Sequence, residues 1–126
     1  MKWVWILLTA APLLAQNCVP PFTLNPNDSQ TAELAPTNCL LSDGTAFVTY
    51  RVIFPVRGAL QLKAKGTGFE PSLILRDEDG RKVDAGASIQ HPVEAGTYYA
   101  VVNGLPNATG PFTLTSTFVP EANILC

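Results

Sequence analysis

The stretch Glu94-Ala95-Gly96-Thr97-Tyr98-Tyr99-Ala100-Val101-Val102-Asn103 decides the fold of this chain. A glycine lies near its start, and an Asn-Gly pair, Asn103 and Gly104, ends it. Aromatic and β-branched residues fill the interval with almost no charge, which is typical of a strand covered on both faces. We therefore predict a central strand, and we expect most other segments to pair with it or to pack over it.

Segments on both sides of this stretch alternate between apolar and polar residues, which predicts an all-β, antiparallel sandwich. No helical period of 3.6 residues occurs after the first fifteen residues. Glycine and proline interrupt the alternation often enough for about eight strands. The expected strands are 30–34 at an edge, 46–54, 58–65, 72–76, 81–84, 88–90, 94–103 and 111–119. The expected inward side chains are Val48, Tyr50, Val52, Phe54, Leu60, Leu62, Ala64, Phe112, Leu114, Ser116 and Phe118.

Three connections have distinct compositions. Residues 17–27 contain three prolines and predict an extended lead-in with little regular hydrogen bonding. Residues 77–80 predict a tight turn in which Gly80 takes a positive φ angle. Residues 91–94, with Pro92, predict an extended connection that delivers the chain to the central strand.

The bulk composition restricts the classes of function. The 126 residues are 47% hydrophobic and only 14% charged, which excludes a disordered, highly charged chain and predicts one compact domain. The net charge is -2 with both signs interspersed, so no basic patch predicts a nucleic-acid partner. No basic amphipathic helix predicts attachment to a membrane surface.

The N-terminus predicts a secretory signal peptide over residues 1–15. Lys2 is followed by an apolar run over residues 3–8 and by small residues that end at Ala15. The apolar run is too short for a membrane span of about 20 residues, so we expect no span in the mature chain. A lipid anchor at Cys18 is a weaker alternative, because Asn17 is larger than the residue expected there. We therefore predict a secreted or periplasmic protein, with a signal at 1–15, a lead-in at 16–29 and the sandwich at 30–126.

The three cysteines, Cys18, Cys39 and Cys126, all follow the predicted cleavage site and so meet an oxidising compartment. An odd number predicts one disulfide and one remaining thiol. We favour the pair Cys18–Cys39, which would close the lead-in, with Cys126 as the alternative partner. Connectivity does not follow from sequence alone.

Candidates for chemistry are few. His91 is the only histidine, and no Gly-x-Ser-x-Gly motif accompanies it, so we predict no catalytic residues and treat a small hydrolase as a rival hypothesis. A lone histidine is also too few for a usual zinc site. Asp77, Glu78 and Asp79 are the densest acids, and Asp77 and Asp79 are weak candidates for calcium. Calcium takes about six to eight oxygen ligands, so we interpret these acids as a solvated turn and predict no cofactor.

Tyr98 and Tyr99 are the candidate contact residues. Adjacent residues in a strand face opposite sides of the sheet, so at most one of the two lies in the core. The other lies on the outer face, where it would contact a partner.

Taken together, these segments resemble the bacterial pre-peptidase C-terminal domain over residues 30–119. The order and spacing of several motifs carry the resemblance: Asn38-Cys39-Leu40-Leu41-Ser42-Asp43-Gly44, Tyr50-x-Val52-x-Phe54, Gly58-Ala59-Leu60-Gln61-Leu62, Phe69-Glu70-Pro71-Ser72-Leu73-Ile74-Leu75, Asp79-Gly80, Ala95-Gly96-Thr97-Tyr98-Tyr99 and Gly110-Pro111-Phe112-Thr113-Leu114. The resemblance implies a jelly-roll-like sandwich and a non-catalytic module, usually appended to secreted peptidases and often removed in maturation. Some related domains bind collagen or other polymers, and some carry calcium. No enzyme accompanies the motifs in this sequence, and residues 84–88 hold one acid where family members often have an Asp/Gly-rich stretch.

The sequence thus predicts a secreted, non-catalytic module that binds an unknown protein or extracellular polymer, or serves in the cell envelope. A calcium-stabilised adhesion domain is the alternative from the same class of binding proteins. A structural remnant without a ligand of its own is a further alternative.

Overall fold

The structure, a computed structural model, describes residues 21–35, 39–105 and 109–121. In these ranges the chain forms nine strands and no helix. The strands are β1 (Phe22–Leu24), β2 (Asp28–Leu34), β3 (Phe47–Phe54), β4 (Gly58–Gly66), β5 (Ser72–Arg76), β6 (Lys82–Gly86), β7 (Ser88–Val93), β8 (Gly96–Asn103) and β9 (Gly110–Pro120). Among the described residues, none forms a helix long and apolar enough to cross a membrane.

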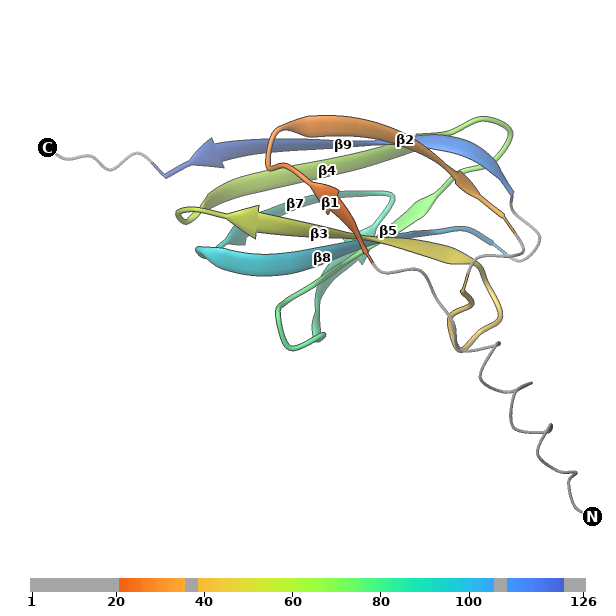
Figure 1. The fold of residues 1–126 in the computed structure, drawn as a ribbon, viewed down its shortest axis with the longest axis horizontal. Coiled ribbons are helices and arrows are strands. Elements are labelled where there is room, and N and C mark those ends of the chain that lie inside the picture. The colour runs from red at the N-terminus through yellow and green to blue at the C-terminus, as the bar shows by residue number, and fades with distance from the viewer. Residues whose placement is uncertain (1–20, 36–38, 106–108, 122–126) are drawn as a thin grey trace, which may run out of the picture.

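The strands form two sheets that pack face to face (Figure 1). The five-stranded sheet has the order β1-β3-β8-β5-β6, and the four-stranded sheet has the order β2-β9-β4-β7. Without β1, the remaining eight strands have the strand order of a jelly roll. The prediction of an all-β, jelly-roll-like sandwich is therefore confirmed.

The stretch that organises the sequence is the central strand of the five-stranded sheet. β8 pairs with β3 on one side and with β5 on the other, antiparallel in both cases. Its last four residues, Ala100 to Asn103, are all buried, although they alternate between the two faces. Val101, on the outer face, is only 3% exposed. The first half of β8 is partly exposed, so coverage of both faces is confirmed only for the second half.

The core lies between the sheets, where the predicted inward residues meet. In β3 and β9 every predicted inward side chain is buried, as are Leu60 and Leu62 in β4. Ala64 is partly buried and packs against this core. Ser116 is the polar member of the set, and its hydroxyl donates a hydrogen bond to the carbonyl of Pro26 over 2.6 Å. A buried hydroxyl with such an acceptor avoids the cost of losing its water partners.

The lead-in departs from the sequence prediction. We expected little regular hydrogen bonding over residues 17–27, and this is wrong for β1, which pairs with β3. The pairing is parallel, the single departure from antiparallel pairing among the described strands. It arises because β2, which follows β1, crosses to the other sheet before the chain returns as β3. β2 also begins at Asp28, ahead of the expected Gln30.

The connection expected at residues 91–94 is also wrong in part. β7 continues through His91 and Pro92 to Val93. Proline lacks the N–H that a central strand would need, but β7 is an edge strand of its sheet. An edge strand has one side without a neighbour, so Pro92 can pair with Ala59 of β4 without breaking the sheet.

Candidate binding site

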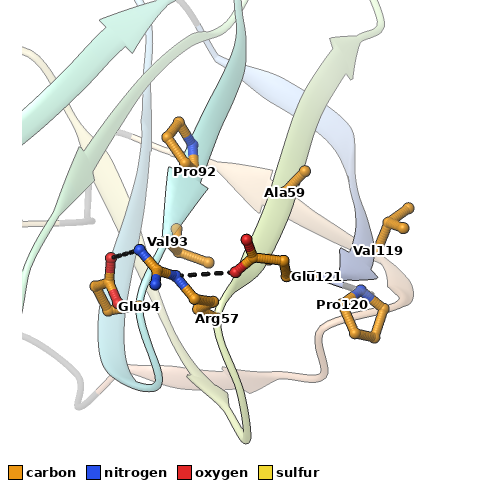
Figure 2. A pocket seen from close by; sticks show the side chains of 9 residues that line it. Arg57, Ala59, Pro92, Val93, Glu94, Val119, Pro120 and Glu121 are labelled. Atoms are coloured by element: carbon orange, nitrogen blue, oxygen red, sulfur yellow. Dashed lines mark hydrogen bonds and ion pairs between the residues drawn. The ribbon is translucent and has the colours of Figure 1, made fainter. Parts of the chain in front are cut away.

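The outer face of the four-stranded sheet is hollowed along β4. Ala59 is paired with Pro92 of β7 on one side and with Val119 of β9 on the other. Its methyl group is smaller than both neighbours, so the sheet surface dips between them. Two adjoining hollows of about 410 and 430 Å³ share these three residues as lining. We call them together the β4 groove, and Figure 2 shows the first of them.

Charged side chains close one end of the β4 groove. The guanidinium of Arg57 lies 3.2 Å from a carboxylate oxygen of Glu94 and 3.1 Å from one of Glu121 (Figure 2). All three side chains are well exposed, between 59% and 68%. Exposed ion pairs contribute only about 0–1 kcal/mol each, so this end can rearrange at little cost. Its formal charge is −1, because two carboxylates meet one guanidinium.

Polar, uncharged side chains line the other end of the β4 groove. Gln61 is paired with Gln90 of β7 and with Thr117 of β9, and all three line the second hollow. Each glutamine amide carries both hydrogen-bond donors and an acceptor. The groove therefore has an apolar surface in the middle, side-chain amides at one end and charged side chains at the other.

His91 lies beside the second hollow, but its ring is directed to the edge of the sandwich. Nδ1 of His91 lies 3.5 Å from Oδ2 of Asp84 on β6. Within the described residues, no other polar contact of the His91 side chain occurs. The structure thus brings His91 to a carboxylate, as the hydrolase hypothesis requires. It does not place a serine, threonine or cysteine of the described ranges in hydrogen-bond contact with the ring.

The acids at 77–79 form the turn between β5 and β6. One oxygen of Asp77 accepts hydrogen bonds from the backbone N–H groups of Asp79 and Arg81, both over 2.9 Å. Gly80 has a φ of 86°, so the predicted positive angle is confirmed. Over the described ranges, no three His, Cys, Asp or Glu side chains come together as a metal site would require. The Asp77 carboxylate thus has a structural partner in its own turn.

Tyr98 and Tyr99 face opposite sides of the sheet, as predicted from their adjacency. Tyr98 packs on the core, edge to face against Phe54 with ring centroids 5.6 Å apart, and its hydroxyl accepts a hydrogen bond from the N–H of Glu94 over 3.0 Å. Tyr99 lies on the outer face, partly exposed, in register with Arg51 and Arg76. The contact role of either tyrosine stays a prediction.

Cys39 is disulfide-bonded. Cys18 and Cys126, the two candidate partners, lie outside the described residues, so the choice of Cys18 stays a prediction. Cys39 immediately precedes a short hairpin in which Leu40 bridges to Ala46 and the N–H of Phe47 donates to the carbonyl of Cys39 over 3.0 Å. The bond is therefore attached close to the start of β3.

The sequence alone does not predict the β4 groove. Ala59, Pro92 and Val119 are far apart along the chain and become neighbours only through strand pairing. The one available signal is a small residue, Ala59, at an outward position of an alternating strand.

Comparison with known proteins supports the fold. No family model and no curated protein matches this chain. The pre-peptidase C-terminal domain of a collagenase from Bacillus anthracis is similar in structure, with a TM-score of 0.63 and 15% sequence identity over 80% of this chain and 100% of that domain. A periplasmic inhibitor of g-type lysozyme from Aeromonas hydrophila has a TM-score of 0.59 and 8% identity over 78% of this chain and 96% of its own. The chain thus has the fold of a pre-peptidase C-terminal domain.

Proposed function

We propose that this chain is an exported, non-catalytic β-sandwich module of the pre-peptidase C-terminal type, and that it binds a protein partner through the β4 groove. The observation that carries the proposal is the depression at Ala59 between Pro92 and Val119. Val119 is 61% exposed and shares this face with the exposed Ala59 and Pro92, and it is a contiguous apolar patch that marks a contact surface.

The shape of the β4 groove favours an extended polypeptide as its occupant. Outward side chains recur along β4 at Ala59 and Gln61, about 7 Å apart, and an extended peptide repeats its side chains at the same interval. An apolar side chain of the peptide would lie over Ala59. Its backbone amides would bond to Gln61 and Gln90, since glutamine amides can donate and accept. The excess carboxylate at the Arg57 end favours a basic residue there.

The two similar structures support a binding role without defining the partner. One is a domain of a collagenase and the other is an inhibitor of a lysozyme, so each is associated with an enzyme. By analogy we propose an accessory or inhibitory contact with a protein outside the cytoplasm. The fold alone does not carry a function, so the proposed binding role depends on the groove.

Export is the second part of the proposal. The predicted signal peptide at residues 1–15 supports secretion or delivery to the periplasm. The disulfide at Cys39 supports it independently, because disulfides persist in oxidising compartments. Mass spectrometry of the protein recovered from the native extracellular or periplasmic fraction tests this part. A mature mass that begins near residue 16 is the expected result, and an intact Met1 in the cytoplasmic fraction contradicts it.

Filling the β4 groove tests the binding site. The mature chain and its Ala59→Trp variant are used to capture proteins from the native extracellular fraction, and the affinity of the captured partner is then measured by calorimetry. Ala85→Trp is the matched control, because Ala85 is an exposed alanine on a strand of the other sheet. We expect Ala59→Trp to weaken partner binding at least tenfold and Ala85→Trp to leave it unchanged. Equal affinities for the wild type and Ala59→Trp would contradict the assignment of the groove.

A further inference from the structure

A row of cations crosses the outer face of the five-stranded sheet, on the side of the molecule away from the β4 groove. Tyr99 of β8 is the direct partner of Arg51 on β3 and of Arg76 on β5. Arg76 is in turn the partner of Lys82 on β6. Directly paired residues share a face of the sheet, so these four side chains form one line across four strands. We call this line the Tyr99 row.

We propose that the Tyr99 row is a second binding surface, and that it binds an acidic segment of a protein partner. This surface is separate from the proposed β4 groove and does not depend on it. Neighbouring strands lie about 4.8 Å apart, so Arg51 and Arg76 are about 10 Å apart with Tyr99 between them. Carboxylates of an extended peptide recur about every 7 Å on one face, within reach of two flexible arginine side chains at that distance.

The charges of the Tyr99 row are not neutralised within the described residues. Arg51 is exposed, and neither Arg51 nor Lys82 forms an ion pair there. Arg76 donates a hydrogen bond from Nη1 to the carbonyl of Gly80 over 3.1 Å, which places its guanidinium beside the turn between β5 and β6 without compensating its charge.

Three of the four acids at positions 77–84 make other contacts. The Asp77 carboxylate accepts backbone N–H groups of its own turn, and Asp79 lies 4.0 Å from Arg81. Asp84 faces His91 at the sandwich edge. Glu78 lies in the same turn and is exposed. The row itself carries three cations, Arg51, Arg76 and Lys82, and no acid, on a chain of net charge -2.

One pairing in the row works against folding. Arg76 and Lys82 are cross-strand partners just beyond the register shift between Leu75 and Arg76, and like charges opposite each other disfavour strand pairing. Binding of a carboxylate between them would remove this repulsion. The arrangement is thus unfavourable in the free protein and favourable in a complex with an acidic partner.

The surface around the row favours a protein over a sugar polymer. Sites for small ligands are concave, whereas Arg51, Arg76 and Tyr99 do not line the β4 groove, the hollow beside Asp77 to Asp79 or the hollow beside Phe69. Tyrosine and arginine are the side chains enriched at the centres of protein interfaces. Ile53, on the same face of β3, is 56% exposed and adds apolar contact area. Each guanidinium can bind a carboxylate through two parallel hydrogen bonds.

Binding of a synthetic glutamate-rich peptide to the mature chain tests the proposal. Arg51→Ala is the main variant, since the exposed Arg51 side chain makes no ion pair in the described ranges and its removal should leave the fold intact. Lys63→Ala is the matched control, because Lys63 is an exposed cation on the outer face of the other sheet. We expect at least tenfold weaker binding for Arg51→Ala, unchanged binding for Lys63→Ala, and weaker binding of the wild type at higher salt.

Two further measurements separate the alternatives. Ala59→Trp should bind the glutamate-rich peptide as the wild type does, so loss of binding in that variant would move the site to the β4 groove. A soluble uronic-acid polymer is compared with the peptide at equal carboxylate concentration. Preference for that polymer would overturn the assignment of a protein partner. The binding surface itself would be rejected if Arg51→Ala and Lys63→Ala weakened peptide binding equally, or if the wild type did not bind the peptide.

Discussion

Asp84 and His91 connect the edges of the two sheets. Nδ1 of His91 on β7 lies 3.5 Å from Oδ2 of Asp84 on β6. The side chain of His91 is 32% exposed and that of Asp84 is 36% exposed. β6 is the edge of the five-stranded sheet and β7 the edge of the four-stranded sheet. The pair therefore spans the open side of the sandwich next to the connection that joins these two strands. This position gives His91 a structural contact at the edge of the sandwich.

Removal of this pair should have a small effect on stability. We expect His91→Ala and Asp84→Ala each to lower the free energy of unfolding by about 1 kcal/mol or less, because a partly exposed side-chain contact of this kind contributes little. The double variant should lose less than the sum of the two, with a coupling of about 0.2–1 kcal/mol. Urea denaturation of the four proteins measures this. If His91→Ala instead abolished a hydrolytic activity of the wild type while the fold persisted, the small-hydrolase hypothesis would replace the structural one.

Tyr50→Phe should stabilise the protein. The hydroxyl of Tyr50 is buried and has no hydrogen-bond partner in the described part of the chain. A buried polar group without a partner is unfavourable, so its removal should raise the free energy of unfolding by about 1 kcal/mol. Chemical denaturation at pH 7 measures the change. A loss of stability of that size would mean that the hydroxyl has a partner beyond the described residues.

The raised pKa of the Tyr50 phenol predicts a loss of stability in alkaline solution. Burial raises the pKa of Tyr50 from 10.0 to about 12. Between these values the unfolded chain releases the phenol proton while the folded chain keeps it, so folding is disfavoured as the pH rises through this window. The wild type should therefore lose stability relative to Tyr50→Phe between pH 10 and pH 12. Parallel alkaline profiles of the two proteins would show that the Tyr50 phenol is not the cause of the loss.

The lowered pKa of Asp43 predicts a contribution to the stability of the fold that is lost in acid. Hydrogen bonds from the hydroxyl of Thr45, over 2.6 Å, and from its N–H, over 3.0 Å, lower the pKa of the Asp43 carboxyl below 3.8. A lowered pKa stabilises the fold above the unfolded value, and this contribution is lost as the pH falls through the folded value. Asp43→Asn keeps an acceptor for Thr45 but removes the charge. We expect the stability difference between wild type and variant to shrink below about pH 4, as measured by thermal unfolding.

Gly58→Ala should destabilise the sheet below the β4 groove. A Cβ atom at this position would contact the carbonyl oxygen of Val119 and lie 2.7 Å from the ring of Phe118. Overpacking of this kind costs about 1–3 kcal/mol, because neighbouring backbone and side chains must shift. Denaturant unfolding measures the loss, with Lys63→Ala on the same strand as the control. Equal stabilities of the two variants would show that β9 can move away from β4 freely.

Reduction of the disulfide at Cys39 should lower stability. A disulfide typically contributes about 2–4 kcal/mol by restricting the unfolded chain. We expect Cys39→Ser to melt at a lower temperature than the oxidised wild type and at about the temperature of the reduced wild type. Peptide mapping under non-reducing conditions identifies the partner, for which we predict Cys18. A linked peptide that contains Cys126 would reject this pairing.

Much of the fold follows from local alternation of residue types. β3 and β9 alternate so regularly that their inward side chains and their limits could be predicted to within about two residues. The reason is physical: a strand with one face on the core must place apolar side chains at every second position. β1 and the second half of β7 could not be predicted in this way. β1 has three residues, and β7 contains a proline that is acceptable only because no strand pairs with its far side.

The two proposed surfaces, by contrast, depend on pairing between distant parts of the chain. Ala59 forms a depression only because Pro92 and Val119 flank it, and Arg51 and Arg76 form a row only because β8 lies between their strands. Periodicity in one segment determines which side of a strand faces water. It does not determine which residue of another strand lies opposite, because that depends on sheet order and register. The local pattern of side chains was therefore sufficient for the two-layer architecture, whereas the surfaces that could bind a partner required the three-dimensional arrangement.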